Sequence, residues 1–168
     1  MKCHLVVALG ALASCLAIQA QPSPSAEIKQ GYNRIKTNLS KAAEKVPEDQ
    51  YGFKPSPDIR SFGELIGHIA TAQIRTCNAV LGEQTAAGGA KTSKADLVAA
   101  LKDSFTACDK AFDSLTDANL AQGVKIGQRE ISRITALIGM LTHSNEEYGY
   151  LAVYMRLKGV VPPSSEGR

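Results

Sequence analysis

The sequence predicts an all-α fold, a bundle of four helices. Apolar residues recur at three- and four-residue spacing in four segments of about 20 to 30 residues, which is the pattern of amphipathic helices. Residues that favour helix starts or ends bound these segments, and no segment shows a convincing strand pattern. A chain of 168 residues is long enough for one domain in which such helices bury their apolar faces together.

The first helix is expected from about Ala26 to Val46. Pro47 ends it, because proline disfavours a helical conformation in the residue before it. The segment from Pro47 to Arg60 contains three prolines and one glycine and is expected to be irregular. Ser61 and Glu64 have the spacing of a capping box, so we expect the second helix to begin there and to end near Gly82.

The second half of the chain is expected to hold two more helices. Residues 86–91 are rich in Gly and Ala and predict a loop, after which Ser93 is the N-cap of a third helix. A further loop is expected over Asp117–Gln128, and a fourth helix from about Arg129 to Lys158. Gly159 then suits the C-terminal cap. The long connections leave room for helices that do not simply alternate in direction.

The first 20 residues are typical of a secretory signal peptide, with Lys2 before an apolar run from Leu5 to Ile18. We expect cleavage near Ala20, followed by a linker over residues 21–25, a bundle over 26–163 and a tail over 164–168. An alternative is a lipoprotein signal, because the sequence that ends in Cys15 resembles a lipobox. Lipidation of Cys15 would anchor the protein to a membrane; both interpretations predict export to the periplasm or beyond.

The charge balance is too weak to predict a nucleic-acid partner. The formal net charge is +3, and it falls to +2 when the first 20 residues are removed, because Lys2 is the one charged residue among them. The chain has no tryptophan, no basic run and no aromatic-basic patch. We therefore exclude nucleic-acid binding as the expected function.

Cys77 and Cys108 are the two cysteines that remain after cleavage near Ala20. Because export places them in an oxidising compartment, we predict a disulfide between these two residues that joins the second and third helices. The alternative is two small buried residues on apolar helix faces. In a simple antiparallel hairpin of the second and third helices, these cysteines would lie at different heights.

His143 and Glu147 are four residues apart, so on a helix they lie one turn apart on the same face. His68 is the only other histidine outside the N-terminal segment, and it too lies in an apolar helical run. Three such ligands from two helices suit a divalent metal with an open coordination position. The sequence therefore predicts a metal site of His68, His143 and Glu147.

Three motifs resemble the DinB-like (DinB/YfiT) superfamily. They are FKPSP at residues 53–57, RSFGELIGHIA at 60–70, and the segment from His143 to Gly159 followed by Pro162-Pro163-Ser164. The resemblance implies a four-helix bundle of DinB/YfiT-like topology and a histidine triad that holds nickel or zinc. In that pattern one histidine comes from the second helix, here His68, and two come from the last helix, here His143 and position 147.

Glu147 departs from the family pattern, which leaves two functional hypotheses open. In the first, the chain is an exported divalent-metal-binding bundle with thiol-dependent transferase or hydrolase activity, acting on a small-molecule thiol or an electrophilic substrate. The thiol chemistry is what the resemblance implies. In the second, the chain is a metal-free binding or structural module that has lost the third histidine. A homodimer is compatible with either hypothesis.

Overall fold

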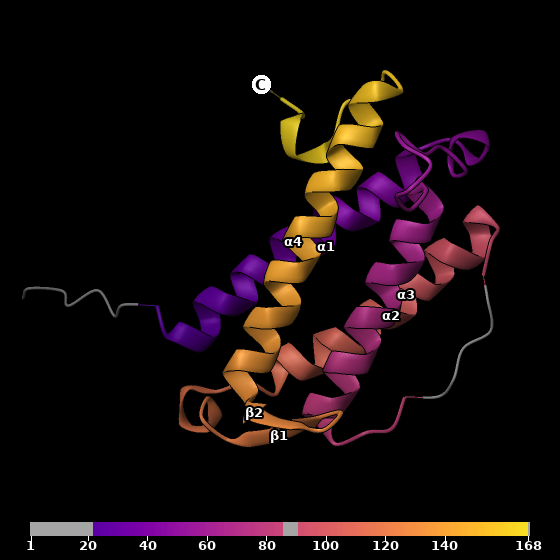
Figure 1. The fold of residues 1–168 in the computed structure, drawn as a ribbon. Helices are drawn as coiled ribbons and strands as arrows, with labels where there is room; N and C mark the ends of the chain where they lie inside the picture. Colours follow the sequence, from indigo (N-terminus) through magenta and orange to yellow (C-terminus); the bar gives the residue numbers. More distant parts are fainter. Residues whose placement is uncertain (1–21, 86–90, 168) are drawn as a thin grey trace, which may run out of the picture.

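The structure, a computed structural model, describes residues 22–85 and 91–167. Its helices confirm the predicted four-helix bundle (Figure 1): α1 Pro24–Lys45, α2 Phe62–Leu81, α3 Lys94–Asp113 and α4 Arg133–Leu157. Three short 3-10 helices lie at Glu48–Gln50, Asp117–Asn119 and Pro163–Ser165. The expected signal peptide, its cleavage site near Ala20, and Cys15 lie outside the described residues. In the described ranges, no helix is both long enough and apolar enough to span a membrane.

Each of the four α-helices begins after a serine that caps it. The side chains of Ser23, Ser61, Ser93 and Ser132 each accept a hydrogen bond from a backbone N–H three residues later. Such a bond satisfies one of the N–H groups that have no partner in the first helical turn. The caps also correct two expected starts: α1 begins two residues earlier than expected, within the expected linker, and α4 begins four residues later.

We expect Ser61→Ala to lower the free energy of unfolding by about 1 kcal/mol, because the side-chain half of the capping box would be lost. Ser61 Oγ accepts from the Glu64 N–H at 3.2 Å, and Glu64 Oε2 accepts from the Ser61 N–H at 2.6 Å. Urea denaturation measures the loss. The control is Thr37→Ala, which removes an exposed hydroxyl from the interior of α1. An equal effect of both variants would contradict a capping role.

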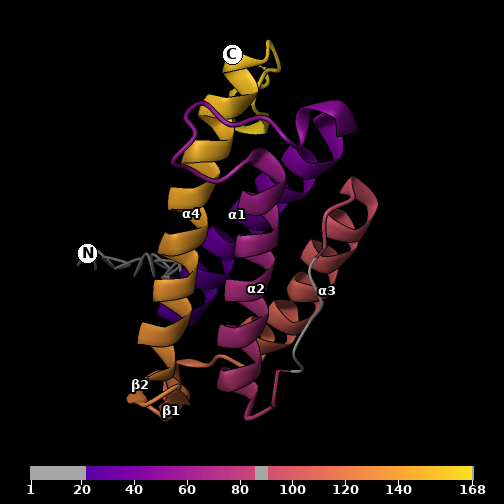
Figure 2. The ribbon, with the colours of Figure 1, turned by 45° about the vertical axis from the view of Figure 1, so that its right-hand side comes forward.

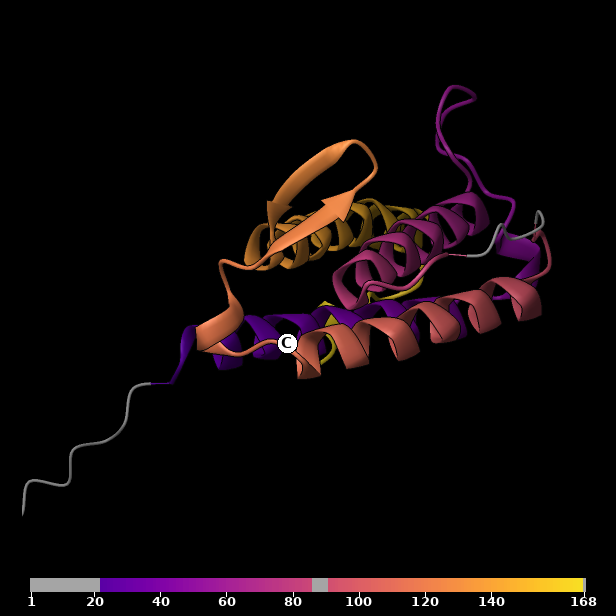
Figure 3. The ribbon, with the colours of Figure 1, turned by 90° about the horizontal axis from the view of Figure 1, so that it is seen from below.

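The helices do not alternate in direction. Helices α2 and α3 run parallel, because residues about 31 apart face each other along both helices: Gln73 bonds Ser104, and Cys77 bonds Cys108. The parallel arrangement means that the start of α3 at Lys94 lies at the same end of the bundle as the start of α2 at Phe62. Helices α1 and α4 run the opposite way (Figures 1 and 2). Seen from below, α2 and α4 form one layer and α1 and α3 the other (Figure 3).

The predicted disulfide between Cys77 and Cys108 is present, with the two Cα atoms 5.0 Å apart. The expected mismatch in height does not arise, because it assumed an antiparallel hairpin. In the parallel pair, both cysteines lie about the same distance from the start of their helices. Both side chains are fully buried in the core shared by the four helices.

The expected loop over Asp117–Gln128 and the expected start of the fourth helix at Arg129 are wrong in part. Strands β1 Gly123–Ile126 and β2 Arg129–Ser132 form an antiparallel hairpin that packs against the end of the bundle. Gly127 occupies the first position of its two-residue turn with a φ of 62°. A left-handed conformation at that position favours glycine and matches the twist of a hairpin.

Candidate metal centre

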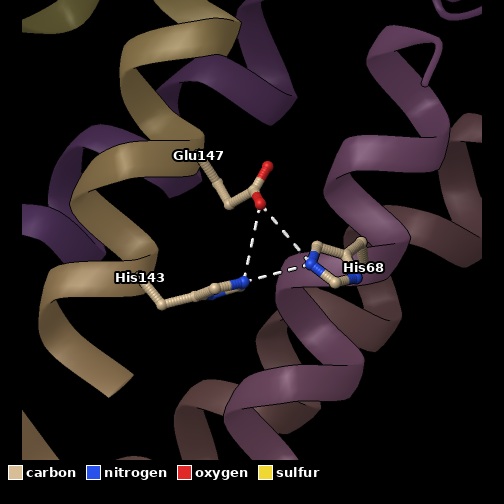
Figure 4. Close-up of side chains that lie close together, drawn as sticks. All are labelled: His68, His143 and Glu147. Atoms are coloured by element: carbon tan, nitrogen blue, oxygen red, sulfur yellow. Dashed lines mark hydrogen bonds and ion pairs between the residues drawn. The ribbon is translucent and has the colours of Figure 1, made fainter. Parts of the chain in front are cut away.

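The three sequence-predicted ligands lie together between α2 and α4. His68 lies two turns into α2, while His143 and Glu147 lie one turn apart on α4. Because α2 and α4 are antiparallel neighbours, His68 faces the α4 pair across the helix interface (Figure 4). The helical register predicted from the sequence therefore places the three side chains on facing surfaces.

The three ligand atoms form a compact triangle. Nε2 of His68 lies 3.0 Å from Nε2 of His143, and Oε1 of Glu147 lies 3.4 Å and 3.5 Å from these two nitrogens. The point equidistant from the three atoms of such a triangle lies about 2 Å from each, close to the roughly 2.0–2.2 Å bonds of zinc to imidazole and carboxylate. The donor set therefore fits a first-row divalent ion with open positions on one side.

The hydrogen-bonding capacity of these atoms also favours a cation. A neutral imidazole carries one N–H and a carboxylate carries none. Unless one imidazole has its proton on Nε2, all three ligand atoms therefore direct lone pairs at the middle of the triangle. The second oxygen of Glu147, Oε2, is buried without a hydrogen-bond partner in the described structure. A buried, incompletely satisfied carboxylate is costly unless a positive charge compensates it.

The site is closed on the Glu147 side and open on the histidine side. The Glu147 side chain is 9% exposed, whereas each histidine side chain is 32% exposed. Partial burial lowers the pKa of the His68 imidazole, and the positive charge of Arg60 acts in the same direction, while Glu147 opposes them. The lowered pKa favours the neutral form of His68, which is the form that binds metal.

A groove of about 840 Å³ adjoins the site on the α2–α3 side. Its wall includes His68 and Thr71 of α2, together with Arg60, which lies just before that helix. This volume lies within the range of small-molecule sites. The exposed guanidinium of Arg60 has no hydrogen bond or ion pair within residues 22–85 and 91–167, so it can contact an anionic group in the groove.

Sequence reasoning missed a polar network behind the ligands. Gln73, Ser104 and Ser144 are completely buried, and Gln73 is hydrogen-bonded to both serines, so the network spans three helices. The available signal was a set of polar residues within apolar helical stripes.

Comparison with known proteins gives one family. The model of the DinB superfamily matches residues 32–151. A DinB-like protein from Bacillus cereus has a solved structure that is 19% identical, with a TM-score of 0.68 over 81% of this chain and 93% of that chain. A DinB-like protein from Bacillus subtilis is 21% identical, with a TM-score of 0.63 over 79% and 92%. A search of curated proteins gave no match.

One solved structure in the comparison is an enzyme that depends on a thiol. The mycothiol-dependent maleylpyruvate isomerase is 17% identical, with a TM-score of 0.54 over 77% of this chain. The match covers 60% of the isomerase chain. At this identity, the likeness establishes a shared fold.

Proposed function

This chain belongs to the DinB superfamily, and we propose that it is an exported metal-binding bundle whose His68–His143–Glu147 site supports thiol-dependent transfer. The observation that carries this proposal is the convergence of three ligand atoms, each within 3.5 Å of the other two. Nickel and zinc are the proposed metals, because imidazole and carboxylate donors suit both ions.

Each residue has a distinct part in this proposal. His68 and His143 supply neutral nitrogen ligands from facing helices, and Glu147 supplies a negative charge that partly neutralises a divalent ion. A metal with open positions lowers the pKa of a bound thiol or water, which makes either a nucleophile near neutral pH. The partly exposed histidine side admits the substrate, while the buried Glu147 side keeps water away from the back of the site.

The proposed substrates are a small-molecule thiol and an electrophilic acceptor. The fold shared with a mycothiol-dependent isomerase supports a thiol, and the groove beside His68 has room for a small molecule. Hydrolysis at the same open position is the related possibility, with water in place of the thiol. Export is proposed from the N-terminal sequence, with the periplasm or the exterior as the compartment.

We expect the mature protein, purified without an affinity tag, to contain about one equivalent of divalent metal per chain. Elemental analysis by mass spectrometry measures this content. Removal of the metal with a chelator is expected to lower the melting temperature, because a ligand present at 100 times its Kd stabilises by about 2.7 kcal/mol. Protein that contains no metal and takes up neither zinc nor nickel would refute the metal site.

A metal-free binding module is the second candidate function. It is favoured by Glu147, which stands where the family pattern has a histidine, and by the 3.0 Å contact between the two imidazoles. That contact is within hydrogen-bonding distance, so one ring can donate to the other without a metal. In this case the melting temperature would not respond to zinc, nickel or a chelator.

A further inference from the structure

Gln73 lies on α2, five residues after His68, with 0% of its surface exposed. Both the nitrogen and the oxygen of its side-chain amide form hydrogen bonds in the core. Nε2 donates to Ser144 Oγ on α4 at 3.1 Å, and Oε1 accepts from Ser104 Oγ on α3 at 2.8 Å. One side chain therefore joins three helices through hydrogen bonds that are shielded from water, where such bonds are strongest.

The bond to α4 lies directly beside the candidate metal ligands. Ser144 follows His143 in the sequence, and it too is 0% exposed. Apart from the contacts of His68 with His143 and Glu147, the Gln73–Ser144 bond is the one polar side-chain contact between α2 and α4 in the described residues. The disulfide fixes α2 against α3, but α4 has no covalent link to α2 among those residues.

We infer that Gln73 is a positioning residue that sets the register of α2 against α4 and thereby holds His68 opposite His143 and Glu147. Apolar contacts alone would permit small slides and rotations of α4, because they are not directional. A hydrogen bond between two fully buried groups permits few, because a shift leaves the Gln73 amide N–H without its acceptor on α4. Displacement of about 1 Å would spoil a three-ligand site. This inference rests on the proposed metal site.

Overall stability does not explain the glutamine. A buried polar network can often be replaced by apolar groups of the same shape at little cost. Methionine has nearly the length of glutamine and adapts its shape to a core. A methionine here would keep the packing and remove the directional link to α4, so Gln73→Met separates register from stability.

We expect Gln73→Met to keep the melting temperature of the wild type within a few degrees and to raise the Kd for zinc about tenfold, by analogy with residues that orient metal ligands. Ser144→Ala cuts the same link from the α4 side and should weaken zinc binding in the same direction. The matched control is Ser104→Ala, which cuts the link to α3. Because α3 carries none of the three ligands, the zinc Kd of Ser104→Ala should stay within about twofold of the wild-type value. Calorimetric titration of the metal-free proteins with zinc measures the Kd of all three variants.

A second readout needs no metal. The rings of His68 and His143 have centroids 5.0 Å apart, so their protons should give a nuclear Overhauser cross-peak in chelated wild-type protein. The cross-peak should weaken in Gln73→Met and Ser144→Ala but persist in Ser104→Ala. If the wild type binds no zinc, the proposed function fails while this readout still tests the positioning role. Unchanged zinc affinity and an unchanged cross-peak in Gln73→Met, or equal losses in Ser104→Ala and Ser144→Ala, would overturn the inference.

Discussion

Glu147→Ala is expected to weaken zinc or nickel binding by roughly 100-fold or more, because it removes one of three ligands rather than an outer-shell partner, whose loss typically costs 10- to 100-fold. The carboxylate also supplies the negative charge that stabilises a divalent ion in a partly buried site. Glu147→His restores three ligands in the arrangement of the family pattern and should bind at least as tightly as the wild type. Calorimetric titration of metal-free protein measures each Kd.

Glu146→Ala is the matched control for this loss. Glu146 is the adjacent carboxylate on α4, but it is exposed and lies outside the site. It tests whether the general loss of negative charge on α4 matters, and we expect a Kd within about twofold of the wild type. Wild-type affinity in Glu147→Ala would show that the carboxylate is no ligand. Tight binding by Glu147→His but not by the wild type would favour the metal-free module.

Helix positions could be predicted because their signals are local. The Ser61–Glu64 pair fixed the start of α2, and Gly159 adopts the left-handed conformation expected after α4. These features depend on hydrogen bonds within a few residues of sequence. The weaker signals were at the ends without a recognised cap: Ser23 and Ser132 were not identified as N-caps, so α1 and α4 were each misplaced by a few residues.

Two features were not predicted: the β1–β2 hairpin and the parallel pairing of α2 and α3. Strand β1 has only four residues, and alternation over so short a stretch is hard to distinguish from a loop. The Gly127–Gln128 turn was the usable signal, since a glycine at the first position of a two-residue loop favours a hairpin. The parallel pairing of α2 and α3 could not be read from helical periodicity, because periodicity gives each buried face but not the direction of its neighbour.

One part of the candidate site could be predicted from local spacing, and the other part depends on how the helices pack. The spacing of His143 and Glu147 placed both on one face of α4, and the structure agrees. The placement of His68 opposite them depends on the packing of two helices, so it was inferred from its position in an apolar helical run and from the family resemblance rather than from spacing. The role of Gln73 required a third helix as well, so it emerged from the structure alone.

The double variant Cys77→Ala/Cys108→Ala is expected to lower the free energy of unfolding by about 3–4 kcal/mol in the chain-entropy model. The bridge joins residues 31 apart and so restricts the unfolded chain around the whole crossover between α2 and α3. Parallel helices need such a long connection, which makes their pairing costly in chain entropy. Urea denaturation of oxidised wild type and the double variant measures the difference.

Reduced wild-type protein is the control that separates the bond from the packing of the side chains. It keeps both sulfur atoms in the core, so it lacks only the covalent link, whereas the double variant also loses the volume of two sulfurs. We expect the reduced protein to lose most of the 3–4 kcal/mol and the double variant to lose slightly more because of the cavity. Thiol titration of unfolded, unreduced protein should find no free thiol from Cys77 or Cys108 in exported material. Two free thiols, with equal stability before and after addition of reductant, would show instead that the cysteines act as two small buried residues.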